Sequence, residues 1–397
     1  MNSLPLENIR VLELTHIVAG PTAGLILADM GADVIKIESP DALEPGRLGT
    51  GRNGSFFFLN RNKSHIVLDL KKEEALAVFY RLADKADVFI ENMGPGVTDR
   101  LGIGYDELSR RTPRIVYCSV KGFLSGPYAD RSSMDELAQM MSGLAFMTGP
   151  SGRPLRAGAS ITDIGAAAFG VIGILAALRE RDATGKGQLV TSGLFETALF
   201  YVGQHMAQTQ FSGQPPRPMA ERDRRSPGGS PVYDLFVCAE DRHVFIAAFN
   251  VSQWKKLCQV LGFTDLLAHP ELQNMAGLGN ARPWTMPRLE ETIRTWDAKT
   301  LVAQLSAQGV PASMVNTPES VLEETHVHAP QRLLNVGAGE KSLSLPTLPF
   351  ESSDYHFSVR HNPAVRPGRD TRQVLAEAGY SPAEIDHLLQ TEAAKVL

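Results

Sequence analysis

The stretch IRVLELTHIVAGPTAGLILADMGADVIKIE, residues 9–38, decides the fold. Residues 9–14 form a short apolar run that is typical of a buried strand, and residues 33–38 form a second one. Between them, a small and apolar segment that opens at Gly20 and closes at Gly31 predicts a helix. A strand, a helix and a strand within about 30 residues indicate a βαβ unit, which implies a parallel sheet with right-handed crossovers.

The alternation of strands and helices continues toward the C-terminus. Further strands are expected at residues 65–70, 87–92 and 115–120. Because ligands gather at the carboxyl ends of parallel strands, the polar groups found there predict one ligand-binding edge. These groups are Thr15-His16, Glu38, Glu91-Asn92 and Lys121-Gly122. The glycines of the first unit do not fit G-x-G-x-x-G, which argues against a dinucleotide site.

A change in composition divides the chain. Residues 214–231 are rich in proline, glycine and arginine, as expected for a linker or a mobile loop. We therefore expect the N-terminal part of a large α/β domain in residues 1–213 and a smaller α+β domain in residues 232–340. Residues 341–397 are expected to return to the large domain.

Composition and charge narrow the range of possible functions. A hydrophobic content of 43%, a charged content of 21% and a net charge of −5 are ordinary for a globular protein and do not favour nucleic-acid binding. The three cysteines form no CxxC pair, so neither a disulfide framework nor a metal site is expected. The first residues lack a signal-peptide pattern, and no uninterrupted apolar run reaches the ~18 residues of a membrane span. A cytoplasmic protein without membrane association is expected.

One acidic residue stands out. Asp163 precedes residues 165–178, in which no side chain carries a charge. One interpretation is an N-cap of the predicted helix 165–181, because aspartate accepts hydrogen bonds from the free N–H groups of a first turn. The other interpretation is a nucleophile, since a carboxylate held in a dry site can form covalent intermediates.

Motifs spread over the whole chain resemble those of a known family. They are VLEL (11–14) with AGP (19–21), GADVIKIE (31–38), NRNKS (60–64), DVFIEN (87–92) with GPG (94–96), VKGF (120–123), Asp163, GILAAL (173–178), TGKGQ (184–188) and PGRDT (367–371). In this order the sequence resembles the class III CoA-transferases and their relatives, the alpha-methylacyl-CoA racemases.

The resemblance implies a fold and a chemistry. It implies a Rossmann-like large domain, an interlaced homodimer, no permanently bound cofactor, and a coenzyme A thioester as substrate. Asp163 would attack the thioester carbonyl, giving a mixed anhydride and then an aspartyl-CoA thioester. The N–H groups of Ile164 and Gly165, with the loop 227–230, could stabilise the oxyanion, and the helix N-terminus would keep Asp163 ionised.

The resemblance also implies binding residues. The residues expected to contact CoA are Val18, Lys63, Leu70, Lys71, Lys72, Asn92, Met93, Arg100 and Leu101. The residues expected at the acid substrate are His16, Arg47, Arg52, Met134, Gly228 and Gly229. Because arginine can hold a carboxylate bidentately, we expect CoA transfer from succinyl-CoA or a similar donor to a small dicarboxylate.

Two alternatives stay open. In the racemases a histidine directly precedes the aspartate at the start of the helix after the fifth strand, whereas this chain has Met134-Asp135. Methionine cannot move a proton, so this position favours a transferase over a 2-methylacyl-CoA racemase or epimerase. The third possibility is a non-catalytic acyl-CoA-binding protein.

Overall fold

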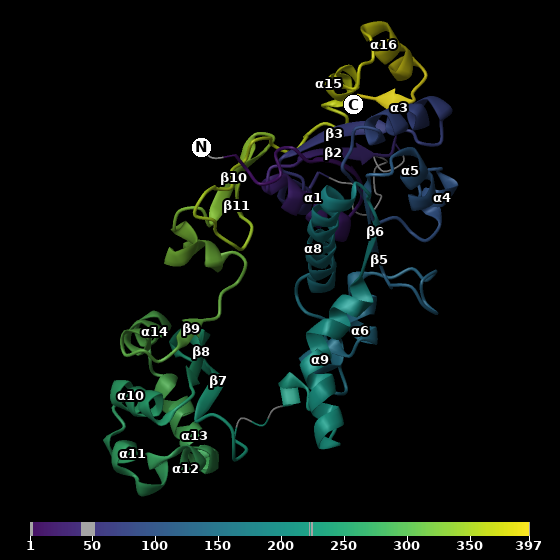
Figure 1. The fold of residues 1–397 in the computed structure, drawn as a ribbon. Helices are drawn as coiled ribbons and strands as arrows, with labels where there is room; N and C mark the ends of the chain where they lie inside the picture. Colours follow the sequence, from purple (N-terminus) through teal and green to yellow (C-terminus); the bar gives the residue numbers. More distant parts are fainter. Residues whose placement is uncertain (1–2, 41–51, 222, 224, 397) are drawn as a thin grey trace. The chain divides into compact units, whose positions relative to one another are not determined.

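The computed structural model describes residues 3–40, 52–221, 223 and 225–396. The chain forms two compact units (Figure 1). Unit 1 consists of Met1–Ala220 and His328–Leu397, and unit 2 consists of Glu221–Val327. Unit 1 is therefore made from two segments of the chain, with unit 2 inserted between them.

Unit 1 is built on a seven-stranded sheet with the order β12-β3-β2-β1-β4-β5-β6. Its strands are β1 (Arg10–Leu14), β2 (Asp33–Glu38), β3 (Lys63–Leu68), β4 (Val88–Glu91), β5 (Val116–Lys121), β6 (Leu189–Gly193) and β12 (Ala394–Lys395). All neighbours are parallel except β12, which pairs antiparallel with β3. The predicted Rossmann-like α/β class is confirmed.

Helices cover both faces of this sheet. The helices of unit 1 are α1 (Ala19–Asp29), α2 (Gly54–Leu59), α3 (Glu73–Ala83), α4 (Val97–Arg100), α5 (Tyr105–Arg111), α6 (Asp135–Met141), α7 (Leu144–Thr148), α8 (Ile161–Thr184), α9 (Leu194–Ser212), α15 (Thr371–Glu377) and α16 (Pro382–Gln390). A hairpin of β10 (Leu333–Ala338) and β11 (Lys341–Pro346) also belongs to unit 1.

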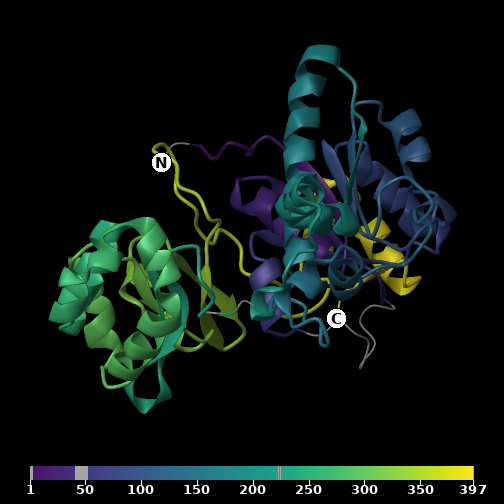
Figure 2. The same cartoon turned by 90° about the horizontal axis from the view of Figure 1, so that it is seen from below.

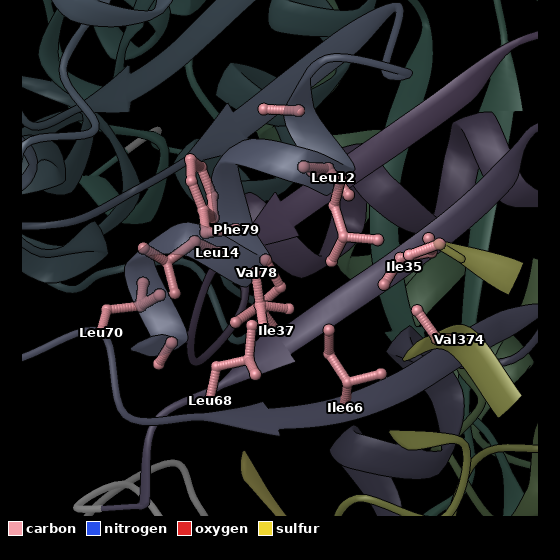
Figure 3. Packing of buried hydrophobic residues seen from close by; sticks show 14 of the residues in the cluster. Leu12, Leu14, Ile35, Ile37, Ile66, Leu68, Leu70, Val78, Phe79 and Val374 are labelled. Atoms are coloured by element: carbon pink, nitrogen blue, oxygen red, sulfur yellow. The ribbon is translucent and has the colours of Figure 1, made fainter. Parts of the chain in front are cut away.

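Alternate residues of the strands enter two separate cores. Leu12, Ile35 and Ile66 pack with Phe79 of α3 and Val374 of α15 on one face (Figure 3). The neighbouring residues of the same strands pack with α1 and α8 on the other face. Because both faces are buried, these strands are almost continuously apolar, which is the pattern that the sequence shows.

Helix α8 is the longest helix of the chain's described part, at 24 residues. By length and composition it could cross a membrane, with a mean hydropathy of 2.0, but half of that window is buried inside the protein. It packs against α1, α9, β5 and β6. Its apolar sequence is thus that of a core helix.

Unit 2 is a small α+β body (Figure 2). Its antiparallel sheet has the order β7-β8-β9, with β7 (Val232–Val237), β8 (His243–Ala248) and β9 (Ala312–Met314). Its helices are α10 (Val251–Leu261), α11 (Thr264–Ala268), α12 (Met275–Asn280), α13 (Arg282–Ile293) and α14 (Ala298–Ala307). They share one apolar core around Trp254, so unit 2 has a core of its own.

Candidate active site

The carboxyl ends of β1, β4 and β5 meet at one edge of the unit 1 sheet. The strand order reverses between β1 and β4, which is where open α/β sheets bind ligands. A cavity of about 360 Å³ lies at this edge. It is lined by residues 16–19, 92–95, 120–122 and 131–136, together with Ala129, Ser160, Asp163 and Leu194.

The loops after β1 and β4 are tied to each other. The backbone N–H of His16 donates to Asn92 Oδ1, and Asn92 Nδ2 donates to the His16 carbonyl, both at 2.9 Å. The next residue, Ile17, has a φ of 64°, a left-handed conformation that is unfavourable for a β-branched side chain. Such strain persists only where the surroundings hold the backbone in place. Here the two hydrogen bonds between His16 and Asn92 do so.

A buried charge network lies beneath the first of these loops. Glu13 is fully buried between Lys36 and Lys63, whose Nζ atoms lie 2.8 and 2.7 Å from its two carboxylate oxygens. Burial alone raises the pKa of Glu13, but the two lysine charges outweigh burial and lower this pKa to about 2. Lys36 also donates to the Thr15 carbonyl at 3.0 Å, so the network fixes the residue that precedes His16.

A second network supports the loop after β4. Glu91 is buried and accepts hydrogen bonds from Ser119 and from the Met93 N–H. Lys121 Nζ lies 2.8 Å from Glu91 Oε1 and donates to the Met93 carbonyl at 2.8 Å. The ammonium group of Lys121 therefore holds the turn that forms one wall of the cavity.

Asp163 is the third residue of α8, which begins at Ile161 and not after Asp163 as the sequence predicted. Neither is Asp163 the cap. Asp135 of α6 takes that role, because its Oδ2 accepts from the Thr162 N–H at 2.8 Å and from the Asp163 N–H at 3.3 Å. Thr162 Oγ1 donates to the same oxygen at 2.6 Å.

The remaining N–H groups of the first turn also have acceptors. Ile161 donates to the Ala159 carbonyl, and Ile164 donates to the Ser160 carbonyl. The expectation that Ile164 supplies an oxyanion donor is therefore wrong for this conformation, because its N–H is used inside the helix.

The carboxyl group of Asp163 is left to the cavity. Within residues 3–40, 52–221, 223 and 225–396 it accepts no hydrogen bond, although the side chain is half-buried. Burial, together with the nearby charges of Asp135 and Glu136, raises the pKa of Asp163 to about 7. The expectation of a carboxylate kept ionised by the helix is wrong, since the helix N–H groups serve Asp135.

The cavity brings together several residues predicted from the sequence. His16, Val18, Asn92, Met93, Met134 and Asp163 all line it. Leu70 is buried in the apolar core beside α3, and Leu101 packs against the same core. Lys71 and Arg100 are exposed, and Lys72 Nζ donates to the Thr391 carbonyl at 2.6 Å. Contact of these residues with CoA stays a prediction.

Two cationic residues that were expected to bind ligands form ion pairs inside the fold instead. Lys63 is fully buried, with Nζ bound to Glu13 and to the Pro21 carbonyl, so it cannot reach a phosphate. Arg52 uses both terminal nitrogens on Glu38, at 2.8 and 2.9 Å, so its fork is not available to a substrate carboxylate. Both expectations are corrected, because each cation neutralises an acid inside the fold.

The other predicted substrate residues lie elsewhere. Arg47 is outside the described residues. Gly228 and Gly229 belong to unit 2, with φ values of 100° and 76°, and the Gly228 N–H donates to the Gly279 carbonyl. These backbone conformations are ones that glycine adopts freely. Their role at the substrate stays a prediction.

Sequence reasoning missed two groups of the site. Asp135 and Arg131 both line the cavity, and the sequence patterns above predict neither of them as a site residue. The position of Arg131 shortly after the fifth predicted strand was the available signal. No local pattern indicates that Asp135 caps a helix beginning 26 residues later.

Comparisons with known proteins agree on one family. The model of CoA-transferase family III matches residues 6–371. The chain is 32% identical to a succinate–glutarate CoA-transferase of Agrobacterium fabrum, over 94% of this chain and 95% of that protein. It is 32% identical to a formyl-CoA:oxalate CoA-transferase of Streptomyces avermitilis, over 96% and 97%.

A solved structure supports the same assignment. A CAIB/BAIF family protein from Brucella suis is 29% identical, with a TM-score of 0.83, and the match covers 95% of this chain and all of that one. The fold, the cavity where the strand order reverses and the sequence relatives all support one assignment. The chain belongs to CoA-transferase family III and is an enzyme of that class.

Proposed function

We propose that this enzyme moves CoA from succinyl-CoA, or a similar donor, to a small dicarboxylate, with Asp163 as the nucleophile. The observation that carries the proposal is the carboxyl group of Asp163, which faces the cavity at the sheet's switch point without a hydrogen-bond donor from the described residues. Because burial and two acidic neighbours destabilise its anion, attack on a carbonyl relieves an unfavourable charge.

The transfer can be written with all groups balanced. An oxygen of Asp163 attacks the thioester carbonyl of the donor, the C–S bond breaks, and CoA leaves as the thiolate beside a mixed anhydride. The thiolate then attacks the Asp163 carbonyl, which releases the donor acid and leaves an aspartyl-CoA thioester. The acceptor carboxylate repeats the two steps in reverse, so that Asp163 is regenerated. The leaving thiolate needs no strong acid, since a thiol pKa lies near ~8.5.

The dicarboxylate is supported by the relatives' names. They include CoA-transferases that act with succinate and glutarate, with mesaconate, and with D-citramalate. The cavity also has an apolar part formed by Val18 and Met134 beside its polar groups. A short apolar spacer between two carboxylates suits such a surface.

The substrate class can be tested with a panel of acids. Succinyl-CoA is incubated with glutarate, mesaconate, citramalate, oxalate and butyrate, and new thioesters are separated by chromatography. We expect the highest kcat/KM for a four- or five-carbon dicarboxylate. If no CoA moves and the α-proton of a 2-methylacyl-CoA exchanges with deuterium, the enzyme is a racemase and the proposal fails.

The nucleophile can be located directly. Hydroxylamine added during turnover is expected to convert the acylated carboxyl into a hydroxamate, which peptide mass mapping places at Asp163. Asp163→Asn removes the label, whereas the matched variant Glu136→Gln, a second acid of the same cavity, keeps it. A hydroxamate on another carboxyl group contradicts the assignment.

We also propose a homodimer, and an interlaced one. Unit 1 exposes large apolar side chains on α8 and α9, with exposed fractions of 60% at Ile172, 71% at Phe200 and 90% at Phe211. A second copy is the occupant proposed for this surface, since an apolar face of this kind is rarely left to solvent. Sedimentation should give twice the chain mass for the wild type and a lower mass for Phe200→Glu combined with Phe211→Glu.

A further inference from the structure

The lining of the cavity around Asp163 is rich in acids. Asp135, Glu136 and Asp163 all line it, and of these Glu136 forms an ion pair with Arg156 at 3.4 Å, while the reaction brings in a further carboxylate. Like charges placed close together in a partly dry site repel, so a carboxylate substrate needs a cation there. The lysine and arginine residues among those that line the cavity are Lys121 and Arg131.

Lys121 is already used by the protein. Its Nζ contacts both carboxylate oxygens of Glu91, at 2.8 and 2.9 Å, and donates to the Met93 carbonyl. An ammonium group has three N–H donors, and these three contacts account for them. Lys121 therefore holds the loop after β4 and is not available to a substrate.

The charged group of Arg131 differs from that of Lys121 in its contacts. In the described ranges, 3–40, 52–221, 223 and 225–396, its guanidinium forms no ion pair and donates no hydrogen bond. It stacks over the Tyr128 ring, with Cζ 4.2 Å from the ring centroid. Stacking on an aromatic face orients the planar group and leaves its edge donors free, which is how arginine is prepared for bidentate carboxylate binding.

The chain also fixes where Arg131 lies relative to the nucleophile. Its N–H donates to the Tyr128 carbonyl, which closes a turn. Asp135, four residues further on, is bonded to the first turn of α8 that carries Asp163. The guanidinium and the nucleophile thus belong to one connected wall of the same cavity.

We infer that Arg131 binds the distal carboxylate of the dicarboxylate substrate, and so makes the enzyme selective for diacids over monoacids. This inference rests on the proposed function, because it assigns the second carboxylate of the proposed substrate. It replaces Arg52 in that role. The same fork could equally take a phosphate of CoA, so the experiment has to separate the two anions.

The test compares wild type with Arg131→Gln, Arg131→Lys and the matched control Arg110→Gln, an exposed arginine on α5 that does not line the cavity. Transfer is measured from butyryl-CoA to glutarate and to pentanoate, an acid of equal length with one carboxylate. For Arg131→Gln we expect kcat/KM for glutarate to fall roughly ten- to hundredfold, with pentanoate unchanged. Arg131→Lys should restore part of the loss, and Arg110→Gln should have no effect.

Other outcomes overturn the inference. The Arg131→Gln variant could lose kcat/KM equally with glutarate and with pentanoate. If this loss disappears when the donor is the dephospho-CoA thioester, Arg131 binds a phosphate of CoA instead. No loss with either acid makes Arg131 a solvated surface residue.

Equilibrium binding separates this inference from the proposed function. Calorimetric titration of glutarate and of pentanoate into the wild type, without any CoA, should give tighter binding of glutarate that Arg131→Gln abolishes. If this difference appears while no acid accepts CoA, the proposed transfer fails and the Arg131 site stands. If transfer occurs and glutarate binds Arg131→Gln as tightly as wild type, the Arg131 site fails.

Discussion

Asp163→Asn is expected to stabilise the protein at neutral pH while it abolishes transfer. Asparagine has nearly the same shape as aspartate but carries no charge, so the substitution removes the half-buried anion and little else. The structure makes that anion unfavourable, because burial, Asp135 and Glu136 raise its pKa from 3.8 to about 7. A residue that is strained for function and costs stability is common in active sites.

The magnitude and its sign follow from this pKa. A shift of about three units corresponds to at most about 4 kcal/mol at 1.36 kcal/mol per unit, and exposure to the cavity reduces this to roughly 1–3 kcal/mol. Between pH 3.8 and about 7 the folded wild type holds a proton that the unfolded chain has lost. The stability of the wild type therefore falls as pH rises through this window, and the advantage of Asp163→Asn grows from nothing near pH 4 to its full value above pH 7.

Guanidinium unfolding at several pH values measures this advantage. All three tryptophans, Trp254, Trp284 and Trp296, lie in unit 2, so their fluorescence follows that unit. Far-UV circular dichroism also follows unit 1 and is the signal in which the shifted midpoint is expected. An Asp163→Asn protein that is less stable than wild type at pH 8, or whose advantage does not change with pH, would refute the reasoning.

Three further predictions concern the groups beneath the cavity. Asp135→Ala removes the acceptor of the Thr162 and Asp163 N–H groups and so the cap of α8, and chemical unfolding should show a loss of roughly 0.5–2 kcal/mol; an unchanged midpoint would contradict the capping role. Lys63→Met leaves Glu13 buried with one cation fewer, which should cost roughly 3–5 kcal/mol, while KM for the acyl-CoA stays within about twofold of wild type. A large rise in KM with unchanged stability would instead indicate that Lys63 binds a phosphate of CoA. Gly24→Ala places a Cβ 1.8 Å from Glu13 Oε2, and because a fixed carboxylate then has to move, the free energy of unfolding should fall by roughly 1–3 kcal/mol, measured as a lower thermal midpoint. An unchanged midpoint would show that the Glu13 carboxylate can shift without cost.

Much of the fold followed from local patterns. Apolar runs of strand length, separated by helical segments, predicted a parallel sheet, because a strand buried on both faces shows as a short continuous apolar run. The position of the cavity followed as well, since carboxyl ends of parallel strands share one edge, and His16 and Asn92 do meet there. The sequence shows no comparable pattern for charge pairing, so the expectation that Lys63 and Arg52 bind ligands is wrong, since each neutralises a buried glutamate.

The sequence by itself determined the α/β class, the edge of the sheet at which the cavity lies, and the family, because these depend on periodicity and on the order of motifs. Only the tertiary structure decided what Asp163 is. The first turn of α8 offers its N–H groups to Asp135, and that acid comes from another helix. A pKa depends on which charges and dipoles surround a group in space, and residues far apart in the chain supply them. Folding therefore gives the capping role to Asp135 and leaves the carboxyl group of Asp163 in the cavity with a raised pKa.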